Sequence, residues 1–174
     1  MQCTDAVSVD LGTWNYGNKP REAMPARILP APTREQIQQA QYFIATLPQI
    51  PNEPVHYFAE GMYGRALPIE ANAVVVGKIH RHEHFTLLIS GEATINTDRD
   101  MERIKAPHIW VSPPGAKRIL HTHTDCVFFT SHLNANNSRD IEEIEADLII
   151  SESLFGPDAP ALSEFAAELQ GVFA

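Results

Sequence analysis

Hydrophobic positions in the middle of the chain recur with a period of two, which is typical of β-strands that bury one face. Short β-branched or aromatic runs alternate there with turn-forming residues such as Ser90-Gly91 and Pro113-Pro114-Gly115. We expect strands near residues 55–58, 62–69, 73–80, 84–89, 92–97, 101–104, 108–112, 117–122 and 126–133. Many short antiparallel strands at this spacing predict a sandwich or barrel over residues 55–135.

Helical periodicity flanks this β-region. Residues 33–48 open with Thr33-Arg34-Glu35-Gln36, a Thr-x-x-Gln capping box, and continue with apolar residues at helical spacing. Residues 138–174 predict two more helices, one that starts near Asp140 and one that starts near Ser163. Residues 1–32 carry proline and glycine without periodicity, which predicts an extended arm that lies against something else.

Composition excludes several classes of protein. The 174 residues include 13 Lys+Arg against 22 Asp+Glu, a net charge of −9, so we expect no nucleic-acid partner. The longest apolar runs, such as residues 73–76, fall far short of the roughly 20 residues that cross a bilayer, so we expect no membrane span. The first residues lack the pattern of a secretory signal, which predicts a cytoplasmic location. Cys3 and Cys126 are too few for a disulfide framework, and we expect Cys126 in the core.

Three alternating histidines, His80, His82 and His84, carry the clearest chemical signal. On one unbroken strand, all three imidazoles would point to the same face. With a bend between two strands, His80 and His84 would still flank a common opening. Imidazole nitrogens suit divalent ions such as Zn, Fe, Mn or Ni, so the pattern predicts a metal site, with His132 or water as a further ligand. The alternative is a hydrogen-bonded polar rim without a metal.

Other histidines are interpreted more simply. His132 is in step with Phe128 and Thr130, which is typical of a hydrogen-bonded core histidine. His121 and His123 directly precede a turn, and we expect them to be exposed there. They would join the histidine cluster only if the barrel is short.

Residues 62–133 resemble the cupin superfamily, whose members carry two short motifs. The first motif has paired histidines, an acid and a glycine; here it corresponds to His80-x-His82 and the turn Ser90-Gly91-Glu92. When the motif is aligned on Gly91, His84 stands at the acid, His80 at the second histidine and Lys78 at the first. The second motif corresponds to Pro113-Pro114-Gly115, with Arg118 at the position of its histidine. The resemblance implies a mainly β, cupin-like jelly-roll barrel with one N-terminal and two C-terminal helices.

Cations at two family ligand positions change the expected chemistry. The family points both positions inward, so Lys78 and Arg118 would form an anion site that holds a carboxylate or phosphate. The alternative is that each cation pairs with a buried acid.

Further segments resemble small cupin-like proteins encoded by tailed bacteriophages. These segments are residues 76–82, 111–118, 125–132 and 141–147. The resemblance implies a phage gene product, and we expect a non-catalytic structural or assembly protein of the virion or tail. Its arm and tail would contact neighbouring subunits in a homo-oligomer or larger assembly, since exposed sheet edges are usually covered. The alternative is a metal-dependent cupin enzyme, of oxygenase or isomerase type, acting on a small polar or anionic molecule in the barrel.

Overall fold

A computed structural model describes residues 30–151 of the chain. Most of the expected arm over residues 1–32 and the helix expected from Ser163 therefore lie outside the described residues. Neither helix within the described part has the length and hydropathy that a membrane span requires.

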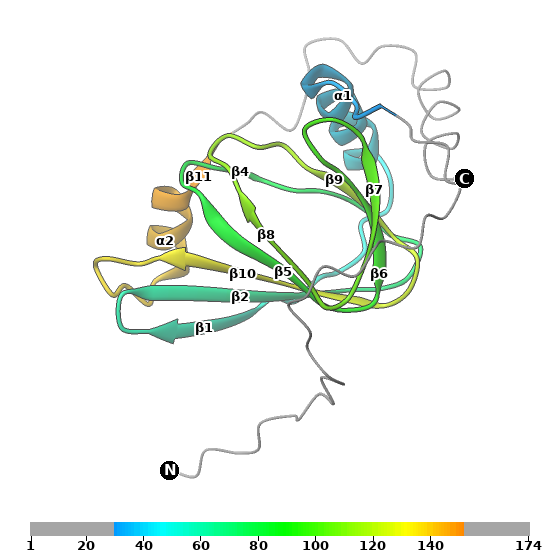
Figure 1. Cartoon of the computed structure of the whole chain (residues 1–174). Helices are drawn as coiled ribbons and strands as arrows, with labels where there is room; N and C mark the ends of the chain where they lie inside the picture. Colours follow the sequence, from blue (N-terminus) through cyan, green and yellow to red (C-terminus); the bar gives the residue numbers. More distant parts are fainter. Residues whose placement is uncertain (1–29, 152–174) are drawn as a thin grey trace.

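Two antiparallel sheets form the body of the protein (Figure 1). The first has the strand order β1-β2-β10-β5-β8 and the second the order β3-β9-β6-β7. The strands of the first sheet are β1 (Val55–Ala59), β2 (Met62–Ile69), β5 (His84–Ser90), β8 (His108–Ser112) and β10 (Cys126–Leu133). Those of the second are β3 (Val74–Val76), β6 (Glu92–Asn96), β7 (Met101–Lys105) and β9 (Ile119–Thr122). A short additional pair joins β4 (Ile79–His80) to β11 (Ile149–Ile150).

The chain passes repeatedly from one sheet to the other, as in a jelly roll. Each of the connections β2 to β3, β5 to β6, β7 to β8 and β9 to β10 crosses between the sheets. The prediction of a mainly β jelly roll is therefore confirmed, although the two sheets do not close into a continuous barrel. The strand expected over residues 73–80 is instead two strands, β3 and β4. The break falls at Gly77, whose N–H donates to the Arg118 carbonyl at 2.9 Å.

Buried apolar side chains fill one end of the space between the sheets. They are Ile69, Ala73, Leu88, Ala93, Ile95, Ile104, Cys126 and Phe128. Cys126 is a free thiol with 2 % of its surface exposed, which confirms its predicted place in the core.

The two helices cover different parts of the sheets. Helix α1 (Arg34–Ala45) begins at the predicted capping box, in which Thr33 and Gln36 exchange hydrogen bonds. Its buried residues Ile37 and Ala40 pack against Ile119 of the second sheet. Helix α2 (Ile141–Leu148) begins at Asp140, whose side chain accepts from two backbone N–H groups. The buried face of α2 contacts Tyr63 on the first sheet. Helix α2 leads directly into β11, so it fixes the position of β4.

Candidate metal centre

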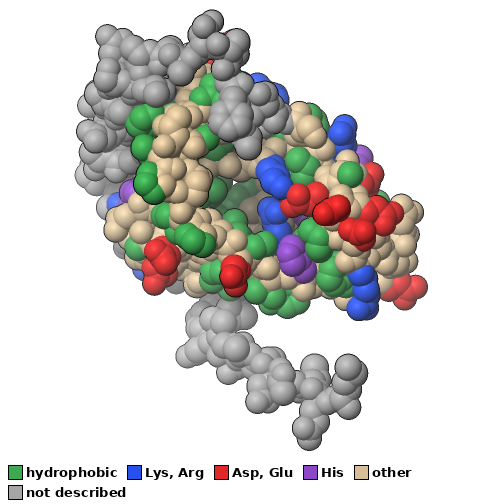
Figure 2. Space-filling model, turned by 180° about the vertical axis from the view of Figure 1, so that it is seen from behind, with side chains coloured by type: hydrophobic (Ala, Val, Ile, Leu, Met, Phe, Trp, Pro, Cys, Tyr) green, Lys and Arg blue, Asp and Glu red, His purple; other side chains and the backbone are tan. Residues whose placement is uncertain are grey.

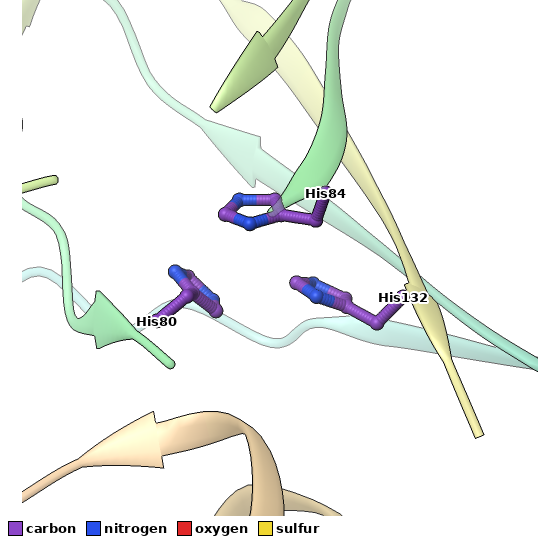
Figure 3. A group of neighbouring side chains, drawn as sticks. All are labelled: His80, His84 and His132. Carbon is purple, nitrogen blue, oxygen red and sulfur yellow. The ribbon is translucent and has the colours of Figure 1, made fainter. Parts of the chain in front are cut away.

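Three histidines from three different strands converge at the end of the molecule beside α2 (Figure 3). His80 lies on β4, His84 on β5 and His132 on β10. The ring centroids are 4.2 Å apart for His80 and His84, 4.5 Å for His84 and His132, and 4.9 Å for His80 and His132. One nitrogen from each ring lies within 4.8 Å of the other two.

Strand register brings His84 and His132 together. Ser131 pairs with Phe85 across β10 and β5, so the residues that follow and precede them are neighbours on the inner face. The burial pattern agrees, because His84 and His132 are buried while Phe85 is exposed. Two strands of one sheet thus supply two imidazoles at fixed spacing.

His80 reaches the site from the opposite side, on a very short strand. Backbone hydrogen bonds hold this strand on both sides of the residue. The N–H of Gly115 donates to the His80 carbonyl at 2.9 Å, and the N–H of Arg81 donates to the Leu148 carbonyl at 2.8 Å. The position of the third imidazole therefore depends on the C-terminal end of α2.

Burial keeps the three imidazoles neutral. It lowers the pKa of both His80 and His132 to about 3, and the neighbouring histidines and the positive charge of Arg65 add to the effect. Burial also lowers the pKa of His84, partly opposed by the contact of its Nδ1 with the His82 carbonyl at 3.2 Å. Neutral imidazole is the form that binds metal ions.

This donor set fits a divalent transition-metal ion. Nitrogens bound to one zinc ion at 2.0–2.1 Å in a tetrahedron lie about 3.3 Å apart. The ligand atoms of the three rings lie within 4.8 Å of one another, so zinc binding would require them to approach by at most about 1.5 Å. Three neutral imidazoles also match the protein ligand number of catalytic zinc sites, which keep a further position for water or substrate.

The segment with His80, His82 and His84 bends between two strands, as the second of the two expected arrangements has it. His82 is exposed in the bend between β4 and β5 and does not join the other two histidines, so the expectation of three imidazoles on one strand face requires correction. His132 takes the third place. It is buried, as expected of a core histidine, but its ring belongs to the histidine cluster.

His121 and His123 lie outside the histidine cluster. Both are half-buried, so the prediction that they are exposed turn residues is wrong. Their rings meet edge to face with centroids 4.8 Å apart, and His123 Nε2 lies 2.7 Å from Thr94 Oγ1.

Lys78 and Arg118, which we expect to form an anion site, each have an acidic partner in the structure. The Lys78 ammonium donates to Glu145 Oε2 at 2.7 Å, and Arg118 Nη1 donates to Asp98 Oδ1 at 3.1 Å. Each cation pairs with an acid, as the alternative predicted, but neither acid is buried: the Glu145 side chain is 37 % exposed and that of Asp98 is 77 % exposed. Acidic side chains of α2 gather with basic ones at this end of the molecule (Figure 2).

Arg65 is the cation whose charge acts on all three clustered histidines. It lies on β2 in step with Tyr63, its side chain is 21 % exposed, and its charge lowers the pKa of His80, His84 and His132. Its Nη1 lies 3.6 Å from Glu145 Oε1, a loose ion pair. A charged residue at an inward position of the alternating strand 62–69 is a sequence signal that could have identified it.

Polar side chains separate the histidines from the apolar core. Thr86 Oγ1 and Ser112 Oγ share a hydrogen bond of 2.9 Å. Thr130 pairs with Thr86 across β10 and β5, and its hydroxyl is buried without a hydrogen-bond partner in the structure. A buried hydroxyl of this kind is available to a bound water or ligand.

A separate open cleft of about 1220 Å³ lies between α1, β3 and β11 (Figure 2). Its lining is mostly apolar and includes Lys78 and Lys117. None of the three clustered histidines lines it, so the cleft and the candidate metal centre are distinct.

Comparison with known proteins finds similarity at the level of solved structures. No protein-family model and no curated protein matches the chain. A protein from Neisseria meningitidis is 12 % identical over 55 % of this chain and 96 % of its own, with a TM-score of 0.41. A cupin-2 domain containing protein from Shewanella frigidimarina is 12 % identical over 52 % of this chain and 88 % of its own, with a TM-score of 0.40. A cupin domain from Bordetella pertussis is 11 % identical over 51 % of this chain and 99 % of its own, also with a TM-score of 0.40.

Proposed function

We propose that the protein binds one divalent transition-metal ion through His80, His84 and His132 and acts as a metal-dependent enzyme on a small anionic molecule. The observation that carries the proposal is the convergence of three imidazoles from three strands, with ligand atoms within 4.8 Å of one another. Three neutral imidazoles in one buried group present nitrogen lone pairs that a single metal ion can share.

Arg65 supports an anionic substrate. A partly buried guanidinium beside a metal site can hold a carboxylate or phosphate with two parallel hydrogen bonds. Its present partner Glu145 is 3.6 Å away, so the ion pair can open when a better-placed anion arrives. Arg65 takes the role that we expected for Lys78 and Arg118, whose side chains engage Glu145 and Asp98.

The remaining residues would position the substrate and exclude water. A bound divalent ion supplies Lewis-acid polarisation of a substrate oxygen. The unpartnered Thr130 hydroxyl can donate a hydrogen bond to the same molecule. Below it, Leu88 and Phe128 close the apolar end of the space between the sheets and keep bulk water out.

Metal analysis of purified protein tests the proposal. We expect near-stoichiometric metal in the wild type and its loss in the His80→Ala/His84→Ala double variant. The matched control is His82→Ala, which removes an exposed histidine from the same segment and should retain the metal. Circular dichroism establishes that each variant is folded. A folded wild type that takes up no Zn, Fe, Mn or Ni, or equal loss of metal in His82→Ala, would refute the assignment.

Assembly is a second candidate function, and a different observation favours it. The outer face of the first sheet is apolar and exposed, as described below. A structural component, including the phage virion or tail protein that the motif resemblance suggests, would use such a face to contact neighbouring subunits. A protein that is metal-free and forms oligomers would support this second candidate over the first.

A further inference from the structure

The outer face of the five-stranded sheet is apolar across all five strands. Strand alternation places apolar side chains outward from β1 at one edge to β8 at the other. The most exposed of them are Val55, Tyr57, Met62, Phe85, Ile89, Ile109, Val111 and Leu133. We call this surface the outer apolar face; Phe129 and Leu87 lie between its exposed members.

No charged side chain interrupts the outer apolar face among the strand residues that the structure describes. The charged residues of the same strands, such as Arg65, point to the opposite side, as do His84 and His132, whereas Ser131 is a polar residue on the outer face. Antiparallel sheets with one solvated face normally carry polar residues on it. Here the inner face of the sheet carries both polar and apolar side chains, whereas the outer face is apolar. We therefore expect another apolar surface, and not water, to cover the outer face.

The centre of the outer apolar face is aromatic. The Phe129 ring lies over Gly64, where an added Cβ would come within 2.6 Å of the ring, and it contacts Tyr57 with centroids 5.9 Å apart. Because Gly64 has no side chain, the aromatic ring can lie down on the sheet. An aromatic, uncharged centre is well suited to packing against a second sheet.

The outer apolar face is large enough to form the central part of an interface. Five strands spaced about 4.8 Å apart and five to eight residues long give a footprint roughly 20 Å on each side, or about 400 Å² in projection. The largest exposed apolar patch on a typical soluble monomer is about 300–600 Å² and is often functional. A standard interface buries roughly 800 Å² per partner, so surrounding residues would have to complete the contact.

We propose that a second copy of this chain covers the outer apolar face, sheet against sheet, around a two-fold axis. In such an isologous interface the same patch serves both partners, so every apolar residue meets an apolar residue. Strand β10 is central in the sheet order, which puts Phe129 nearest the axis. A face without charge suits two copies that each carry a net charge of −9, because it is the surface on which they can meet without burying like charges.

Sedimentation analysis of the full-length protein tests the proposal. We expect a dimer at micromolar concentration, and at least tenfold weaker association in Phe85→Glu and Tyr57→Glu, which place a carboxylate on the face. The matched control is Leu47→Glu, since Leu47 is 45 % exposed, close to the 56 % of Phe85, but lies outside the sheet just beyond α1. Circular dichroism and the unfolding midpoint establish that each variant folds. A wild type that is monomeric at all concentrations, or a dimer indifferent to both substitutions, would overturn the proposal.

Hydroxyl-radical footprinting identifies what covers the face. We expect Tyr57, Met62 and Phe85 to become protected as protein concentration rises. Protection that does not change with concentration would assign the cover to another segment of the same chain and would overturn the proposal of a second copy. The proposal is independent of the metal centre, because Phe85→Glu leaves the three imidazoles in place.

Discussion

At the scale of single residues, three imidazoles can lie this close together only because they are uncharged. Two protonated rings with centroids 4.2 Å apart would repel each other strongly in a buried setting. Burial lowers the pKa of His80 and His132 to about 3, which removes this repulsion at neutral pH and leaves lone pairs available. The charge of Arg65 lowers these pKa values further. The cation that would attract an anionic substrate therefore also keeps the imidazoles in the neutral form that binds metal ions.

A glycine forms the turn between β5 and β6, at the end of the sheets opposite the histidines. Gly91 has φ +90°, and a Cβ there would lie 2.3 Å from the Asp125 carbonyl oxygen and 2.6 Å from Cys126 Sγ. Gly91→Ala should therefore lower the free energy of unfolding by at least about 2 kcal/mol, through backbone strain and overlap with neighbouring main chain. Urea denaturation measures the change.

Gly61→Ala is the matched control for this substitution. Gly61 also has positive φ, +72°, but an added Cβ there meets nothing within 4 Å. It should cost only the strain, about 1 kcal/mol. Equal losses in the two variants would show that contact with Asp125 and Cys126 is unimportant.

At the scale of elements, helix α2 supports the candidate metal centre. Ile144 and Leu148 pack on Tyr63, and the Leu148 carbonyl accepts from Arg81, the residue directly after His80. The strand that follows α2 pairs with β4 through His80 itself. The packing of α2 therefore determines the position of the His80 imidazole.

Truncating the buried face of α2 should weaken metal binding without touching a ligand. Leu148 is 5 % exposed, so Leu148→Ala should reduce stability by about 2–5 kcal/mol. It should also lower metal affinity about tenfold, as loss of supporting contacts around ligands does. Calorimetric titration with Zn²⁺ checks the affinity. Leu148→Met, which preserves volume, should restore most of it, and Leu47→Ala should leave it unchanged. Unaltered affinity in a folded Leu148→Ala protein would show that α2 does not position His80.

Sequence periodicity was sufficient to predict most elements but not the complete site. Strands, the capping box of α1 and the start of α2 follow from local patterns, and the structure confirms them. The break at Gly77 and the pairing of β4 with β11 depend on contacts between distant segments, which periodicity does not report. For the same reason His132, some fifty residues from His80, could be proposed as a ligand but not chosen over His82. Arg65 was missed because its charge lies inside a strand pattern that otherwise looks apolar.

At the scale of the whole molecule, polarity is divided into zones by the two sheets. Between them, a histidine-rich end beside α2 gives way through Thr86 and Thr130 to an apolar end around Leu88. Outside, the five-stranded sheet presents a second apolar zone. The interior zone contains the proposed metal site and the exterior zone is the proposed surface of self-association, so the two proposed properties occupy opposite faces of the same strands.

Salt should strengthen the association of two copies through the outer apolar face. Each copy carries a net charge of −9, so at low ionic strength the two bodies repel while the uncharged interface attracts. Raising the salt from about 20 mM to about 500 mM shortens the Debye length from roughly 20 Å to about 4 Å and screens the repulsion. The dissociation constant from sedimentation equilibrium should fall about threefold to tenfold. The Phe85→Glu variant, if it still associates at high concentration, should show a steeper salt dependence, because it adds a carboxylate to each side of the contact. A dissociation constant that rises with salt would instead indicate an interface built on ion pairs, and the charged surface beside α2 would then replace the sheet face as the place where two copies meet.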